Sequence, residues 1–102
     1  MDKETALKNA TAYAEEVRKF FNPVSIVMYG SYAKGVPGLE SDIDIAIIFN
    51  NYNGNWLNDS AKLWELTRRV STLIEPVLLD QANDPSGFVE NIYNTGEVLF
   101  GA

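Results

Sequence analysis

Residues 25–50 read SIVMYGSYAKGVPGLESDIDIAIIFN, two apolar runs separated by a segment rich in glycine and proline. The first run, SIVMY, consists mainly of β-branched and large apolar side chains and predicts a strand that ends at Gly30. The second run, SDIDIAIIFN at 41–50, predicts another strand. The segment between them predicts a loop, with room for one helical turn beginning at Ser31.

Outside this stretch, apolar spacing and turn residues predict three helices and two more strands. One predicted helix covers 4–21 and is capped by Asp2 or Thr5. A second covers the leucine-rich segment up to Leu73 and is capped by Asn58 or Asp59. A third begins at Asp84-Pro85 and ends at Gly96. The predicted strands are IEPVLLD at 74–80 and EVLFG at 97–101. We therefore expect an α/β (α+β) fold, with three or four strands interrupted by helices, in a single domain spanning 1–102.

The composition excludes several classes of function. The 8 basic residues stand against 14 acidic ones, a net charge of −6, which argues against direct nucleic-acid binding because that affinity rests on cationic contacts to phosphates. Cysteine and histidine are both absent, so disulfides, thiolate nucleophiles and histidine-based catalytic triads are excluded. No apolar run approaches the roughly 20 residues of a membrane span. We expect a cytoplasmic protein with no membrane contact.

Two aspartates at the start of the second strand are the first candidate site residues. Asp42 and Asp44 are two positions apart, so their side chains point to the same face of a strand, while Ile43 and Ile45 point to the other. Like charges side by side destabilise a strand unless a cation neutralises them. Mg²⁺ binds in proteins through one or two carboxylates together with substrate phosphates, so this pair predicts a magnesium site.

The turn at Gly30-Ser31 is a candidate phosphate cradle. It lies where the first strand ends and a helical turn would begin, and exposed backbone N–H groups at such a junction bind anions. Gly30 would let the backbone approach a phosphate closely, and the Ser31 hydroxyl could donate to it. One of the flanking tyrosines, Tyr29 or Tyr32, would line the same pocket. If the first two strands are neighbours, the cradle and the aspartates meet.

A third carboxylate should complete a two-metal site, and the third strand offers two. Glu75 begins that strand and Asp80 ends it, and because they are five positions apart they point to opposite faces. We favour Glu75, since the adjacent Pro76 indicates an edge or a bulge where a side chain can be re-aimed. Asp80 is expected to be solvated.

The order GSYAKG, then SDID, then an acidic residue on the following strand resembles the nucleotidyltransferase superfamily of the DNA-polymerase-β type. The match is nearest to the minimal nucleotidyltransferases and runs from Val24 to Phe100. The resemblance implies the nucleotidyltransferase fold, a small mixed sheet of three to four strands flanked by about four helices. It also implies that Asp42 and Asp44 bind Mg²⁺ and that Gly30-Ser31 binds the nucleotide triphosphate. The third family carboxylate is most often Asp, whereas this chain has Glu75.

The mechanism implied by the resemblance uses two Mg²⁺ ions. One would bridge the β and γ phosphates, and the other, held by Asp42, Asp44 and Glu75, would activate an acceptor hydroxyl for attack on the α-phosphate. Minimal nucleotidyltransferases are commonly paired with a small helical HEPN protein, as the antitoxin of a toxin–antitoxin pair. The resemblance therefore implies transfer of AMP from ATP, or another nucleoside triphosphate, to a tyrosine of such a toxin.

Two other functions remain open from the sequence. The chain could be the catalytic subunit of a split small-molecule nucleotidyltransferase, acting on an acceptor such as an aminoglycoside. It could instead be a non-catalytic antitoxin that blocks its partner by binding, and the Glu75 replacement is the best support for that reading. The Asp44→Asn variant separates catalysis from binding. A homo-oligomer would be a further kind of assembly, since a small domain buries relatively little of its surface.

Overall fold

A four-stranded mixed sheet with the strand order β3-β2-β1-β4 forms the centre of the molecule. The computed structural model describes residues 2–34 and 42–101, so the glycine-rich loop predicted after Lys34 lies outside the described residues. In chain order the elements are α1 (Lys3–Arg18), β1 (Ser25–Tyr29), α2 (Ser31–Lys34), β2 (Ile43–Phe49), α3 (Trp56–Thr67), β3 (Ile74–Asp80), α4 (Phe88–Thr95) and β4 (Glu97–Gly101). The predicted fold class, with four strands, is confirmed.

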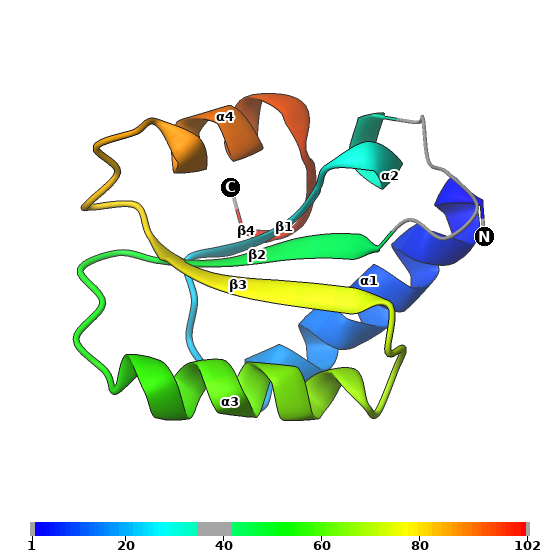
Figure 1. Cartoon of the computed structure of the whole chain (residues 1–102), viewed down its shortest axis with the longest axis horizontal. Coiled ribbons are helices and arrows are strands. Elements are labelled where there is room, and N and C mark those ends of the chain that lie inside the picture. Colours follow the sequence, from blue (N-terminus) through cyan, green and yellow to red (C-terminus); the bar gives the residue numbers. More distant parts are fainter. Residues whose placement is uncertain (1, 35–41, 102) are drawn as a thin grey trace.

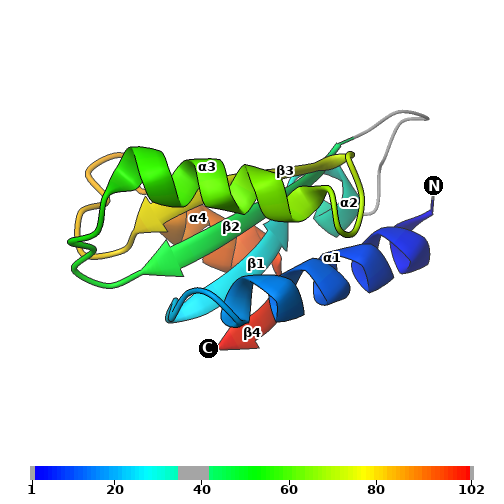
Figure 2. The same cartoon turned by 90° about the horizontal axis from the view of Figure 1, so that it is seen from below.

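Helices cover both faces of the sheet, α1 and α3 on one side and α4 on the other (Figure 1). Figure 2, seen from below, shows α1 and α3 lying next to each other over the sheet. The alternation of a strand explains the two-sided core. Ile43, Ile45 and Ile47 of β2 pack toward α1 and α3, and Ala46 and Ile48 pack toward α4. Both faces of β2 are therefore apolar along most of its length.

The pairing of the strands sets what lies at each end of the sheet. β1 runs antiparallel to β2, with Tyr29 opposite Asp44. β2 runs parallel to β3, with Asp44 opposite Glu75, and α3 makes the crossover that a parallel pair requires. β3 is an edge strand, as Pro76 predicted. The first two strands are thus neighbours, which was the condition for the cradle and the aspartates to meet.

The starts of α1 and α3 show how local hydrogen bonds fix helix boundaries. Asp2 caps α1 by accepting from the Thr5 N–H, as predicted. The cap of α3 is Asn55, which accepts from the Asn58 N–H, so the prediction of Asn58 or Asp59 was wrong. Asp59 instead accepts a hydrogen bond from the Tyr52 hydroxyl.

Three boundaries differ from the predictions because of turns that close the elements. α1 ends at Arg18, three residues earlier than expected, and α3 ends at Thr67, so the turns up to Leu73 are not helical. α4 begins at Phe88 and not at Pro85. Asp84 reaches across that turn to accept from the N–H groups of Val89 and Glu90, and it therefore caps the helix from outside. No described helix is long and apolar enough to cross a membrane.

Candidate active site

Register partners on three neighbouring strands form the candidate site. Tyr29 of β1, Asp44 of β2 and Glu75 of β3 are register partners, so their side chains share one face of the sheet. It is the face that also carries Ala46 and Ile48, which are covered by α4. These residues lie at the edge of the sheet where β2 and β3 begin. We call Tyr29, Asp44 and Glu75 the carboxylate row.

The glycine after β1 lies directly against this row. Gly30 has a φ of +79°, a left-handed conformation that side chains other than glycine rarely adopt. A Cβ added there would clash with Asp44 Oδ2 and would lie 3.3 Å from Asp44 Cγ. The absence of a side chain therefore lets the turn into α2 approach the Asp44 carboxylate. The predicted meeting of the Gly30 turn with Asp44 is what the structure shows.

Unneutralised negative charge is the main electrostatic property of the site. Burial raises the pKa of the half-buried Asp44 carboxyl, and the charge of Asp42 raises it further. The pKa of Glu75 is raised by partial desolvation, by the charges of Asp42 and Asp44, and by a hydrogen bond with Asp42. Burial raises the pKa of the Tyr29 phenol, with smaller contributions from Asp44 and Glu75. Partial desolvation is thus the leading cause in all three groups, and nearby carboxylate charges add to it.

The predicted metal ligands do not form a closed cluster. Among residues 2–34 and 42–101, no group of three or more acidic side chains converges tightly enough to hold a metal ion. Asp42 and Glu75 are exposed, so their side chains can rotate, whereas Asp44 is held between two strands and the Gly30 turn. The predicted helical turn is present, since α2 begins at Ser31 directly after Gly30. The position of Asp44 is therefore fixed by the fold, and the other two carboxylates surround it.

Two residues weighed on the sequence have other roles. Asp80 was expected to be solvated, but its carboxylate accepts from the N–H groups of Asn51, Tyr52 and Ala82. Those hydrogen bonds hold its pKa below the ordinary value, and they lie at the far end of β3 from Glu75. Tyr32 is 1% exposed in the core that α1 covers. Of the two tyrosines that flank the turn, only Tyr29 lies beside the carboxylates.

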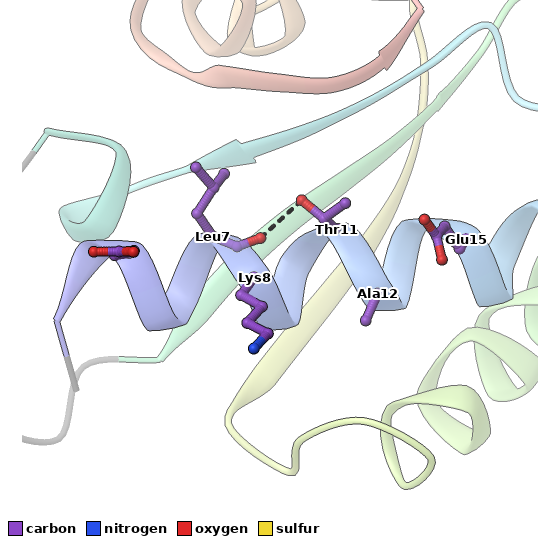
Figure 3. Close-up of a pocket in the computed structure, with 6 residues that line it drawn as sticks. Leu7, Lys8, Thr11, Ala12 and Glu15 are labelled. Carbon is purple, nitrogen blue, oxygen red and sulfur yellow. Dashed lines mark hydrogen bonds between the residues drawn. The ribbon is translucent and has the colours of Figure 1, made fainter.

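Two surface hollows of about 420 Å³ lie away from the carboxylate row. One follows the exposed side of α1, where the Thr11 hydroxyl donates to the Leu7 carbonyl (Figure 3). Figure 3 also shows Lys8 and Glu15 extending from this helix without converging on a common point. Leu7 packs against the core that faces away from Asp44, so this hollow is on the wrong side of the sheet for the carboxylate chemistry.

Sequence reasoning missed Phe88. Although Phe88 lies at the start of α4, next to the buried Val89, its side chain is 41% exposed. Its ring meets that of Tyr29 edge to face, with centroids 5.8 Å apart and planes at 88°. Only the position of α4 over β1 and β2 could have revealed this contact, because the two residues are far apart in the chain.

Comparisons with known proteins agree with this arrangement. The family model described as polymerase beta nucleotidyltransferase matches residues 12–102. A crystal structure of a protein from Sulfolobus solfataricus, assigned as a nucleotidyltransferase, is similar over 94% of this chain and 80% of its own, with 24% identity and a TM-score of 0.67. A chain of a mutant MntA toxin–antitoxin complex is similar over 90% of this chain and 73% of its own, with 19% identity and a TM-score of 0.61.

No curated protein matches the chain. Both solved structures are below 25% identity, so they show the shared fold and nothing finer. The family model covers most of the chain, from the second half of α1 to the end, and so includes the Gly30 turn and the carboxylate row. The resemblance found on GSYAKG and SDID is confirmed by that match. The chain belongs to the polymerase beta nucleotidyltransferase family.

Proposed function

We propose that this chain is a Mg²⁺-dependent nucleotidyltransferase that moves AMP from ATP to a tyrosine hydroxyl of a small helical partner toxin of the HEPN type. In that pair it would act as the antitoxin. One observation carries the catalytic part of the proposal. The left-handed turn at Gly30 lies against Asp44, and Asp44 shares its row with Glu75. A phosphate cradle and paired carboxylates in contact are what nucleotidyl transfer requires.

The residues at the site fit Mg²⁺ by their chemistry. Asp42, Asp44 and Glu75 offer only carboxylate oxygens, which are the ligands this hard cation prefers. Desolvation and, after it, the charges of neighbouring carboxylates raise the pKa of Asp44 and of Glu75, so added positive charge would stabilise their ionised forms. When bound, Mg²⁺ would supply positive charge at the phosphates and make the acceptor hydroxyl easier to ionise.

The chain's own residues would position the reactants. The backbone at Gly30 and Ser31 would hold the β and γ phosphates, and Asp44, with Asp42 and Glu75, would hold Mg²⁺ close to the α-phosphate. The acceptor oxygen forms a bond to the α-phosphorus, the bond from that phosphorus to the bridging oxygen breaks, and pyrophosphate leaves. The hydroxyl proton passes to solvent. No histidine is needed, in keeping with a sequence that has none.

Two observations support a protein partner of basic character. The chain shares its fold with a chain of a toxin–antitoxin complex. Its net charge of −6 would attract a positively charged protein, since complementary potentials speed association. A toxin that acts on RNA would be expected to carry such charge. We place the pair in the cytoplasm.

Intact-mass measurement tests the proposal. The purified chain is incubated with ATP, Mg²⁺ and the helical protein encoded beside it, and the mass of that protein is followed. We expect a gain of one or more AMP units on the partner, absent with Asp44→Asn and absent when EDTA replaces Mg²⁺. Peptide mapping should place the adduct on tyrosine.

The other outcomes discriminate between the remaining functions. A tight complex with no mass gain, and toxin neutralisation that survives Asp44→Asn, would contradict catalysis and indicate an antitoxin that acts by binding. AMP transfer to a cationic small molecule, but not to the partner protein, would indicate a split small-molecule enzyme. Each result is read against the unsubstituted chain under the same conditions.

A further inference from the structure

Tyr29 of the carboxylate row is in contact with an exposed aromatic residue of α4, Phe88. Tyr29 lies directly opposite Asp44 across the β1–β2 pair, and the Phe88 ring meets the Tyr29 ring edge to face at 5.8 Å. Asp44, Tyr29 and Phe88 therefore form a continuous line on one face of the sheet. We propose that the Tyr29–Phe88 pair binds the nucleobase of the donor nucleotide. This inference rests on the proposed function and deepens it.

The packing of α4 on the sheet does not explain why an aromatic residue stands at position 88. The other apolar anchors of α4, Val89 and Ile92, are 4% and 1% exposed, so the helix is seated on the sheet without it. Phe88 begins the helix with 41% of its side chain in solvent. An exposed aromatic ring beside a charged site presents a flat apolar surface that a planar ligand can cover.

From Asp44, the Gly30 turn and Phe88 lead toward two different helices, as the two ends of a nucleotide require. The Gly30 turn, which is suited to the β and γ phosphates, lies against Asp44 and leads into α2. Tyr29, the residue before Gly30, contacts Phe88 at the start of α4, and in Figure 1 α2 and α4 stand at different positions along the same side of the sheet. With the α-phosphate at Asp44, a triphosphate that enters the turn leaves the sugar and base directed toward Phe88.

The chemistry of the pair predicts the kind of selectivity. Every base has a π-face, so stacking on an aromatic side chain tolerates different bases and favours those with more ring area. We therefore expect tighter binding of purine than of pyrimidine nucleoside triphosphates, with little distinction between adenine and guanine. Tyr29, half-buried between Asp44 and Phe88, would hold the Phe88 ring in place and shield the sugar from solvent.

Two ligands distinguish binding of the base from binding of the phosphates. Binding of a non-hydrolysable ATP analogue and of inorganic tripolyphosphate is measured by calorimetry with Mg²⁺ present. We expect Phe88→Ala to weaken analogue binding about 10-fold or more, in the range found for loss of one base–aromatic stack, and to leave tripolyphosphate binding unchanged. Phe88→Leu should lose most of the same affinity, and Phe88→Tyr should keep it.

Phe20→Ala is the matched control. Phe20 has a similar exposure of 47%, but it follows α1 on the other side of the sheet, where Lys62 and Arg69 lie over its ring. Its removal should change neither affinity. Thermal unfolding of each variant checks that the fold is kept, and Phe88→Leu retains most of the apolar volume should the alanine variant unfold.

The outcomes distinguish the base-binding role from the proposed nucleotidyltransferase function on which it rests. Unchanged analogue affinity in Phe88→Ala and Phe88→Leu, or equal losses for both probes, would overturn the base-binding role alone. Unchanged nucleotide affinity with a raised KM for the acceptor would reassign the pair to the acceptor's ring. Failure of the unsubstituted chain to bind either probe would overturn the nucleotide site as well.

Discussion

The two ends of β3 carry acidic residues in opposite circumstances. At its start, Glu75 lies among the like charges of Asp42 and Asp44, and its pKa is raised. At its end, Asp80 accepts from three backbone N–H groups, and its pKa is lowered. The fold thus satisfies one carboxylate fully and leaves the other short of positive charge. The proposed function assigns the missing partner of this cluster to a bound ligand, because functional sites are where perturbed pKa values gather.

At the end of the sheet away from the carboxylate row, polar side chains also have hydrogen-bond partners. The buried Ser25 hydroxyl and the Tyr93 phenol share a hydrogen bond, and Tyr93 in turn donates to Gln81. Gln81 donates to Asn50, so the ends of three strands and α4 are linked by polar contacts. Hydrogen bonds thus tie this end of the sheet together, whereas the opposite end carries the carboxylate row.

The largest expected effect is that of Asp44→Asn on AMP transfer. Even groups that only support metal ligands cost about 10- to 100-fold when removed, so loss of the carboxylate nearest the Gly30 turn should lower the rate by more than about 100-fold. Stability should not fall, because a repelling charge is removed. Initial rates and thermal unfolding, measured on the same preparation, check both parts. A variant that keeps near-normal rates would refute the assignment of this end as catalytic.

Gly30→Ala should damage both activity and folding. The left-handed φ costs a non-glycine residue roughly 1–2 kcal/mol, and the new Cβ would also push the Asp44 carboxylate away, which can lower the rate on the order of 100-fold. Gly87→Ala is the control, since its φ is +73° and an added Cβ would meet nothing within 4 Å. Denaturant unfolding and rates of both variants are compared. Equal losses would show that the Asp44 contact is unimportant.

Asp80→Asn should destabilise the protein and leave the activity of the folded molecules intact. Its carboxylate has a lowered pKa, so its stabilisation is present at neutral pH and is lost as the pH falls through the ordinary value of 3.8 toward the folded-state value. The gap in melting temperature between the natural chain and the variant should therefore narrow on acidification. Melting curves from pH 7 to pH 3 measure it. A gap that widens in acid would contradict this account.

Glu75→Gln should give the smallest effect on stability, and in the opposite direction. Removal of a like charge across a strand pair is worth roughly 0.2–1 kcal/mol, so the free energy of unfolding should rise by a few tenths without Mg²⁺. Denaturant titration in EDTA measures the change. A loss of stability would mean that Glu75 has a stabilising contact that its neighbours do not reveal.

Local patterns predicted most of the fold. Strand positions followed from alternating and β-branched apolar residues, and the end of β1 at the Gly30 turn followed from the turn chemistry itself. Errors arose where a side chain a few positions away sets a helix start. Asp84 caps α4 across a turn, and the helix begins at Phe88 and not at Pro85. Asn55 caps α3, while Asp59 lies inside that helix and accepts from Tyr52.

The candidate site could likewise be predicted only in part. The spacing of Asp42 and Asp44 indicated a shared face, and the structure shows why Asp44 meets Gly30 and Glu75: three strands align these residues in register. Strand order depends on crossovers, which the sequence does not display. The role of Asp80 and the exposure of Phe88 depend on loops and a helix that pack from elsewhere in the chain, so no pattern near either residue indicated them.

The outer edge of β3 has a further consequence for behaviour at high concentration. Gln81 donates to Phe49 and Leu73 accepts from Ile43, so the odd-numbered residues of this strand bond to β2. The nitrogen of Pro76 therefore faces the free edge, where it offers no hydrogen to an incoming strand. Glu75 adds a charge beside it. Residues that border the carboxylate site thus also keep two copies of the sheet from joining edge to edge, and a β-branched replacement at Pro76 would favour aggregation.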